Sequence, residues 1–229
     1  MGTVYKGRHR RTGEVVAVKV IAPGPSKNPV LLQPFEREFV AAKVLDHPNV
    51  VKAIEYCGTL PHPFLVMEFV DGESLGQRVE RTGPMPEAEA VRLIAQVCEG
   101  LQRAHKQGFV HRDVKPDNIM IGADGRIKLI DFGLAKADAL QAKELAGAEL
   151  AGTAAYISPE QAKDASLVDK RADIYSLGVT LYEALTGRLP FEGRNRMQVI
   201  FQHLNTPPVP PSERVPEIPA LASDVCLWM

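Results

Sequence analysis

Residues 111–133 read HRDVKPDNIMIGADGRIKLIDFG, and they are the most informative part of the sequence. At its centre the turn sequence Gly122-Ala123-Asp124-Gly125 separates two short segments, 119–121 and 126–130, which predicts a β-hairpin. A hairpin returns the chain to the edge from which it started, so Asn118 and Asp131 are expected to lie close together. The stretch therefore predicts a polar site at the two open ends of one hairpin.

Helical patterns flank the hairpin on both sides. Pro86 suits a helix start, and apolar residues recur with helical spacing from there to Gly108. Residues 173–185 form a second apolar stretch, which Gly187 is expected to end. Residues 206–220 carry six prolines, which favours a long surface loop over a polyproline ligand.

The first third of the chain has a different character. Residues 14–21 are rich in β-branched side chains and follow a Thr-Gly turn, and residues 64–70 form a second predicted strand. Between them, residues 35–45 have helical periodicity up to a His-Pro-Asn stop. Asp71-Gly72 breaks the second strand and marks a candidate boundary between two lobes.

Composition excludes several classes of protein. The 229 residues are 45% hydrophobic and 24% charged, near the globular average, which excludes wholesale disorder and coiled coil. Because 27 Lys and Arg residues balance 28 Asp and Glu residues, a generic basic nucleic-acid binder is not supported. No apolar run reaches the ~20 residues that span a bilayer. Three widely spaced cysteines without a CxxC pair fit reduced thiols in the cytoplasm.

Several short motifs accompany the central stretch in a fixed order. They are Gly2-Thr3-Val4-Tyr5-Lys6-Gly7, Val16-Ala17-Val18-Lys19, Glu38 nine residues before His47-Pro48-Asn49, His111-Arg112-Asp113-Val114-Lys115-Pro116-Asp117-Asn118, Asp131-Phe132-Gly133, Gly152-Thr153, Ser158-Pro159-Glu160 and Asp173-Ile174-Tyr175-Ser176-Leu177-Gly178. Any one of them carries little weight, but together they resemble the signature set of protein kinases. In detail the chain resembles the bacterial Hanks-type serine/threonine protein kinases over its whole length.

The resemblance implies an α+β, bilobal fold. A small antiparallel sheet with one helix is expected over residues 1–69, and a larger, mainly helical lobe over residues 70–229. The family's glycine-rich loop has three glycines, and this sequence begins at the last of them, Gly2. We therefore expect the first strand and the start of that loop, as well as the family's final helices, to lie outside this sequence.

The resemblance also implies a reaction, the transfer of the γ-phosphoryl group of ATP to Ser or Thr hydroxyls of protein substrates. Asp113 would accept the hydroxyl proton, and Lys115 would touch the γ-phosphate. Asn118 and Asp131 would hold Mg²⁺, which prefers such oxygen ligands. Lys19 would bind the α- and β-phosphates and pair with Glu38. The resemblance further implies that Asp173 hydrogen-bonds the catalytic-loop backbone and that His111 is structural rather than an acid, base or metal ligand.

The nucleotide site expected from the resemblance is mostly apolar. Adenine would hydrogen-bond the backbone of Glu68 and Val70. The remaining positions expected to bind the nucleotide are Gly2, Val4, Ala17, Met67 as gatekeeper, and Met120.

Two other readings compete with a protein kinase. A non-catalytic kinase-like binding module, or an inactive fragment, is favoured only by the two incomplete ends, since Lys19, Asp113, Asn118 and Asp131 are all present. A small-molecule phosphotransferase of related fold would lack the Ser-Pro-Glu segment and the Asp173 helix. The protein substrate, dimerisation and any membrane tether of a longer parent protein are left open.

Overall fold

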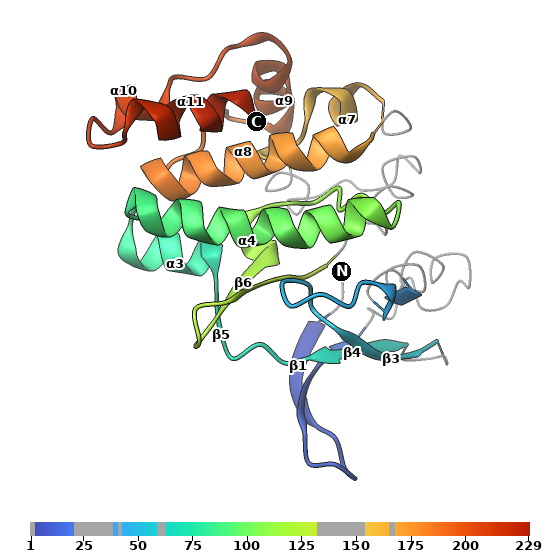
Figure 1. Cartoon of the computed structure of the whole chain (residues 1–229). Coiled ribbons are helices and arrows are strands. Elements are labelled where there is room, and N and C mark those ends of the chain that lie inside the picture. Colours follow the sequence, from blue (N-terminus) through green and yellow to red (C-terminus); the bar gives the residue numbers. More distant parts are fainter. Residues whose placement is uncertain (1–2, 21–38, 41–42, 59–62, 132–153, 165–167) are drawn as a thin grey trace.

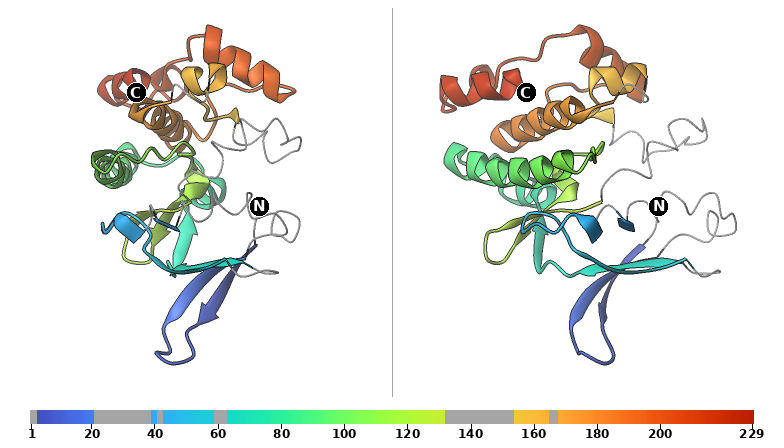
Figure 2. Two further views of the ribbon diagram at one scale, coloured as in Figure 1. Left: turned by 90° about the vertical axis from the view of Figure 1, so that its right-hand side faces the viewer. Right: turned by 45° about the vertical axis from the view of Figure 1, so that its right-hand side comes forward.

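The computed structural model describes residues 3–20, 39–40, 43–58, 63–131, 154–164 and 168–229. These residues form two lobes, a small antiparallel sheet and a larger helical part that carries a second, smaller sheet (Figures 1 and 2). The α+β, bilobal fold class expected from the sequence is therefore confirmed.

The small lobe is a four-stranded antiparallel sheet. Its strand order is β1-β2-β4-β3, and its members are β1 (Thr3–Arg8), β2 (Val15–Val20), β3 (Ala53–Cys57) and β4 (Phe64–Glu68). The β1–β2 hairpin turns at Gly13, whose φ of 76° suits glycine, and it projects away from the rest of the molecule (Figure 1). One face of the sheet is closed by the buried side chains of Val51, Ala53, Leu65 and Met67.

The predicted central hairpin is present, as β6 (Ile119–Gly122) and β7 (Ile127–Leu129). A third strand joins it, because β5 (Gly72–Ser74) pairs with β6. The sequence pattern marked Asp71-Gly72 only as a break after the predicted strand; in the structure β4 ends at Glu68, and Gly72 begins the short strand β5. The backbone N–H of Val51 donates to the Leu129 carbonyl at 2.9 Å, which ties the small lobe to this sheet.

The large lobe consists mainly of helices stacked in layers, with α4, α8 and α11 following one another in Figure 1. Its helices are α3 (Leu75–Thr82), α4 (Glu87–Lys106), α7 (Pro159–Lys163), α8 (Lys170–Thr186), α9 (Arg196–Asn205), α10 (Pro211–Arg214) and α11 (Ala220–Trp228). No helix of the described residues is long and apolar enough to cross a membrane.

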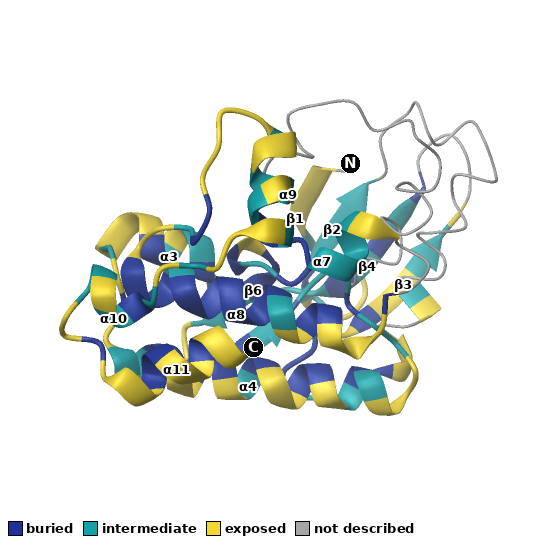
Figure 3. Ribbon diagram, turned by 90° about the horizontal axis from the view of Figure 1, so that it is seen from above, coloured by how far each residue is buried: buried dark blue, intermediate teal, exposed yellow. Residues whose placement is uncertain are grey.

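Helix α8 is the centre of this lobe, and buried residues occupy most of its length (Figure 3). Leu177, Leu181 and Leu185 are each about 1–2% exposed and pack in one core with α4 and the central hairpin. Each fully buried leucine contributes about 1.5–3 kcal/mol through the hydrophobic effect. The helix ends at Gly187, whose left-handed φ of 69° allows its N–H to reach the Glu183 carbonyl at 2.7 Å.

The proline-rich segment differs from the predicted surface loop. Residues 211–214 form α10, where Pro211 is buried. The Tyr182 hydroxyl donates to the Val209 carbonyl at 2.8 Å, and Ile218 joins the main core. Proline fixes its own φ angle but has no backbone N–H to donate in regular secondary structure. The segment has no periodic pattern, and it is held in place by these tertiary contacts.

Candidate active site

The two open ends of the central hairpin meet, as its pattern predicts. Asn118 is the last residue of a short 3-10 turn, η2 (Pro116–Asn118), immediately before β6. The backbone N–H of Ile130 donates to the Asn118 carbonyl at 3.0 Å, and Asp131 is the next residue. The hairpin therefore delivers an amide and a carboxylate to one edge of the sheet.

A second carboxylate, Asp113, lies against the first of these ends. The side-chain nitrogen of Asn118 donates both to the Asp113 carbonyl at 2.7 Å and to Asp113 Oδ2 at 2.8 Å. The Lys115 ammonium lies 3.5 Å from the same Oδ2. Both Asp113 and Asn118 are buried, at 8% and 6% exposed. An acceptor held by an amide and a lysine is fixed in orientation and has little freedom to turn away.

The backbone before Asp113 is held in an unusual conformation. Arg112 has a φ of 65°, in the left-handed region that non-glycine residues seldom occupy. The peptide groups around it are anchored: Asp173 accepts from the N–H groups of His111 at 2.8 Å and of Arg112 at 2.7 Å. On the other side, the Gln161 amide of α7 donates to the Arg112 carbonyl at 3.0 Å.

His111 is fully buried within this loop. Its Nε2 lies 3.1 Å from the Ile130 carbonyl, and its Nδ1 accepts the Asp113 backbone N–H at 3.3 Å. Burial lowers the pKa of the ring, with the neighbouring carboxylates Asp173 and Asp113 opposing that shift. A neutral ring with a proton on Nε2 satisfies both contacts, so His111 links the Asp113 loop to the central hairpin as a structural bridge.

The small lobe contributes a lysine to the same place. Lys19 lies on β2, opposite Val4 of β1 and Leu65 of β4, and its side chain is 13% exposed. Its ammonium lies 2.8 Å from Asp131 Oδ1, a contact across 112 residues of sequence. Asp131 has a φ of 56°, a second left-handed residue in the site. Strained backbone of this kind persists where surrounding contacts enforce it, often at functional sites.

The structure gathers part of the expected apolar nucleotide site. Ala17 and Val70 pack against one small-lobe cluster, of which Met67 is a buried member at 7% exposed. Glu68 follows Met67, and its Oε1 accepts from the Lys52 backbone N–H and the Lys128 ammonium. Val4 is exposed on β1, and Met120 is half-buried on β6, outside this cluster.

Two predicted site residues, Gly2 and Glu38, lie outside the described residues. The expected pairing of Glu38 with Lys19 therefore stays a prediction.

The sequence patterns did not indicate His105 or Gln161. His105 Nε2 lies 2.7 Å from Asp173 Oδ2, and Gln161 holds the Arg112 carbonyl. No sequence pattern at either position assigns the side chain a partner. The only available signal for His105 was a basic residue in the last turn of a helix, a common position for solvent-exposed cations.

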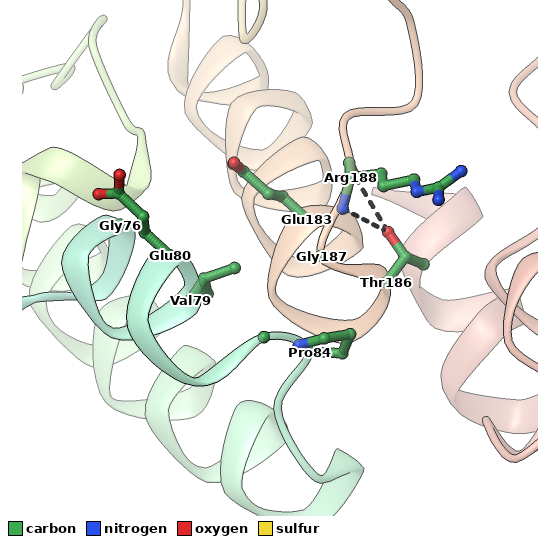
Figure 4. A pocket seen from close by; sticks show the side chains of 9 residues that line it. Gly76, Val79, Glu80, Pro84, Glu183, Thr186, Gly187 and Arg188 are labelled. Atoms are coloured by element: carbon green, nitrogen blue, oxygen red, sulfur yellow. Dashed lines mark hydrogen bonds between the residues drawn. The ribbon is translucent and has the colours of Figure 1, made fainter.

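A pocket of about 500 Å³ lies elsewhere in the large lobe, between α3 and the end of α8 (Figure 4). Its lining includes Glu80, Glu183 and Arg188 but none of the predicted site residues. The Tyr156 hydroxyl donates to Glu183 at 2.6 Å, and burial raises the pKa of both groups. This pocket is separate in its lining from the polar site.

Comparison with known proteins gives matches over nearly the whole chain. A family model described as a protein kinase domain matches residues 1–226. The chain is 42% identical over 218 residues to serine/threonine-protein kinase PknB of Mycobacterium leprae, covering 93% of this chain and 35% of that protein. It is 41% identical to PknB of Mycolicibacterium smegmatis, covering 96% and 37%, and 41% identical to serine/threonine-protein kinase Pkn1 of Myxococcus xanthus, covering 99% and 33%. The chain thus spans about a third of the length of these curated relatives.

Proposed function

This chain belongs to the protein kinase domain family, and from that premise we propose that it transfers the γ-phosphoryl group of ATP to Ser and Thr hydroxyls of protein substrates. One observation carries the proposal: two lysine–carboxylate pairs from different parts of the fold, Lys115–Asp113 and Lys19–Asp131, are linked through Asn118 and the central hairpin. Phosphoryl transfer needs this kind of charge placement and little covalent help.

Asp113 is the proposed catalytic base. Its carboxylate is buried and held by the Asn118 amide, and accepting a hydroxyl proton requires an acceptor in a fixed place. The Lys115 ammonium, 3.5 Å from that carboxylate, can contact the transferred phosphoryl oxygens and oppose their charge. In this proposal Asp113 accepts the proton of the hydroxyl group, and Lys115 stabilises the negative charge on the transferred phosphoryl group.

The donor atoms of Asn118 and Asp131 fit a Mg²⁺ ion that accompanies ATP as part of the substrate. The Asn118 amide nitrogen is engaged by Asp113, and among the described residues nothing hydrogen-bonds its amide oxygen, which is left to bind a cation. The Asp131 carboxylate supplies a second oxygen, and Mg²⁺ in kinases usually has only one or two protein carboxylates, with phosphate and water completing its shell. Bound Mg²⁺ would neutralise the phosphates.

Lys19 is proposed to bind the α- and β-phosphates. Its ammonium already lies 2.8 Å from Asp131 Oδ1, so it could contact the phosphates of a nucleotide whose Mg²⁺ Asp131 would hold. The adenine would lie against Ala17, Met67, Val4 and Met120, with the backbone of Glu68 and Val70 as hydrogen-bonding groups. Gly2 is proposed to approach the phosphates, and Glu38 to orient Lys19.

We further propose that residues 1–69 and 70–229 are the two lobes between which the nucleotide binds. Along the chain, Val70 lies between β4, the last strand of the small-lobe sheet, and β5, the first strand of the large-lobe sheet. The family indicates that the substrates are proteins. From the cysteine pattern we propose that the chain is located in the cytoplasm.

The test is direct phosphoryl transfer. The 229-residue chain is incubated with Mg²⁺, γ-labelled ATP and a generic basic protein acceptor, and labelled amino acids are identified after hydrolysis. Phosphoserine or phosphothreonine is expected from the wild-type chain and absent for Asp131→Ala. Equal labelling by Asp131→Ala would refute the metal assignment. Folded wild-type chain without any transfer would instead favour a non-catalytic binding module or an inactive fragment, and the same assay on a chain extended at both ends would separate the two.

A further inference from the structure

A histidine of α9 is buried and makes a polar contact at each of its ring nitrogens. His203 is 6% exposed, and its ring meets the rings of Tyr175 and Phe191 edge to face, with centroids 5.7 Å and 4.8 Å away. Its Nε2 lies 3.1 Å from the Ala155 carbonyl oxygen, and its Nδ1 lies 2.7 Å from the Tyr175 hydroxyl. Packing and hydrogen bonds together therefore fix the position of this ring.

The two polar contacts determine where the ring carries its proton. A carbonyl oxygen only accepts hydrogen bonds, so Nε2 must be protonated and donate to Ala155. In the neutral ring Nδ1 is then an acceptor, and the Tyr175 hydroxyl donates to it. Burial lowers the pKa of His203 to about 4, so the ring is neutral near pH 7. The tyrosine therefore favours the tautomer that holds the Ala155 carbonyl.

The Ala155 carbonyl is one of two successive carbonyls that side chains of the large lobe hold. His203 of α9 donates to the first, and Ser176 of α8 donates to the second, that of Tyr156, at 2.7 Å. Residues 155–158 precede α7 outside regular secondary structure, and all but Tyr156 are buried. Buried backbone groups need partners, and no helix or strand ladder supplies them here. The two side-chain donors therefore set the position of this segment.

Segment 155–158 lies next to the Asp113 loop. It leads directly into α7, which packs against α9 (Figure 1), and the Gln161 amide of α7 donates to the Arg112 carbonyl at 3.0 Å. Arg112 immediately precedes Asp113, the proposed base. A substrate protein must bring its hydroxyl to Asp113, so the polypeptide around that hydroxyl must lie on elements beside this loop. The nucleotide is instead proposed to lie against the small lobe. We therefore expect segment 155–158 to contact the protein acceptor and not ATP.

We propose that His203 is a positioning residue for the protein substrate: by donating to the Ala155 carbonyl, it holds residues 155–158 where the polypeptide around the acceptor hydroxyl binds. The proposal rests on the proposed kinase function. Within the described residues His203 hydrogen-bonds neither Asp113 nor Lys19, so it acts on the reaction only through this segment. Its loss should weaken the use of a protein acceptor and leave the use of ATP unchanged.

Two substitutions of His203 separate its two polar contacts. His203→Asn places amide atoms near the position of Nδ1, so it can still meet the Tyr175 hydroxyl but is too short to reach the Ala155 carbonyl. His203→Gln carries an amide nitrogen with reach comparable to Nε2. Asn205→Ala is the matched control, because Asn205 is exposed on the same helix and, among the described residues, donates only to the Phe201 carbonyl.

The measurement is steady-state phosphoryl transfer in which a generic basic protein acceptor and ATP are varied in turn. We expect His203→Asn to raise the KM for the acceptor by about tenfold, the effect of losing a hydrogen bond at a buried carbonyl, with the KM for ATP within about twofold. His203→Gln should recover most of the acceptor KM, and Asn205→Ala should match wild type. A general loss of folded protein would lower kcat without raising the acceptor KM alone.

Amide hydrogen exchange gives a second readout that needs no activity. The amides of residues 155–158 should exchange faster in His203→Asn than in wild type, and at near wild-type rates in His203→Gln. If the wild-type chain transfers no phosphate, the proposed function fails, and exchange still decides whether His203 holds this segment. If His203→Asn does not fold, Tyr175→Phe, which removes the donor to Nδ1, replaces it with a smaller expected rise in the acceptor KM. Unchanged exchange or an unchanged acceptor KM in His203→Asn, equal rises in the Asn and Gln variants, or a parallel rise in the KM for ATP would overturn the proposal.

Discussion

Replacing Asp173 by alanine should destabilise the whole chain, because this buried carboxylate accepts hydrogen bonds from two backbone N–H groups of the Asp113 loop. Asp173→Ala leaves the N–H groups of His111 and Arg112 without their acceptor, and it removes the partner of His105. An unsatisfied buried donor costs about 1–3 kcal/mol, so two backbone donors cost together about 2–6 kcal/mol. Arg112 is only half-buried, so water can partly solvate its N–H group. The expected loss in the free energy of unfolding is therefore in the lower part of this range, about 3 kcal/mol.

For a chain of this size, about 3 kcal/mol corresponds to a fall in Tm of roughly 6–12 °C. The assay is thermal unfolding followed by far-ultraviolet circular dichroism, with Asp173→Asn in parallel. The Asn variant keeps one acceptor oxygen and should fall between wild type and Asp173→Ala. Asp169→Ala is the control: Asp169 caps the same helix by accepting from Arg171 N–H but is exposed, so its removal should lower Tm less. Equal Tm values for Asp173→Ala and wild type would refute the reasoning.

Three further predictions follow from other contacts. Asn118→Ala should raise the Mg²⁺ concentration for half-maximal transfer by about tenfold or more, and Asn118→Asp, which keeps an oxygen, by less; equal Mg²⁺ dependence would remove Asn118 from the metal site. Burial lowers the pKa of His203 to about 4, so between pH 6.5 and about 4 the unfolded chain takes up a proton that the folded chain does not. Stability should therefore fall as pH drops through that window, and thermal melts of His203→Gln should show a shallower fall; parallel curves would contradict this. Gly72→Ala would place a methyl carbon 1.9 Å from the Ile121 carbonyl oxygen, so β5 must separate from β6, which should cost about 1–3 kcal/mol in urea unfolding; a neutral result would mean that this strand pair adjusts freely.

The sequence predicts those parts of the site whose conformation depends on residues adjacent in the chain. The turn sequence at 122–125 was sufficient to predict the hairpin that joins Asn118 to Asp131, since a two-stranded hairpin depends on neighbouring residues. The helix over 87–106 and the end of α8 at Gly187 were predicted for the same reason. The resemblance supplied the expected functions of the residues, which no periodicity could have done.

Contacts between distant segments could not be predicted in this way. The 2.8 Å contact of Lys19 with Asp131 depends on how the two lobes meet, and β5 exists only because β6 provides a partner for its three residues. His105 has the pattern of an exposed cation at a helix end, and its partner is 68 residues away. Propensity is a weak guide at such positions, because tertiary packing decides them.

The proposed role of Asp113 is tested most directly by the turnover rate of Asp113→Asn, measured beside wild type. Asp113, held at Oδ2 by Asn118 and Lys115, is the proposed proton acceptor of the reaction. The Asn variant keeps the size of the side chain and loses the basic oxygen, so kcat should fall on the order of 10²-fold or more, with KM for ATP little changed. Turnover within a few-fold of wild type would contradict Asp113 as the base.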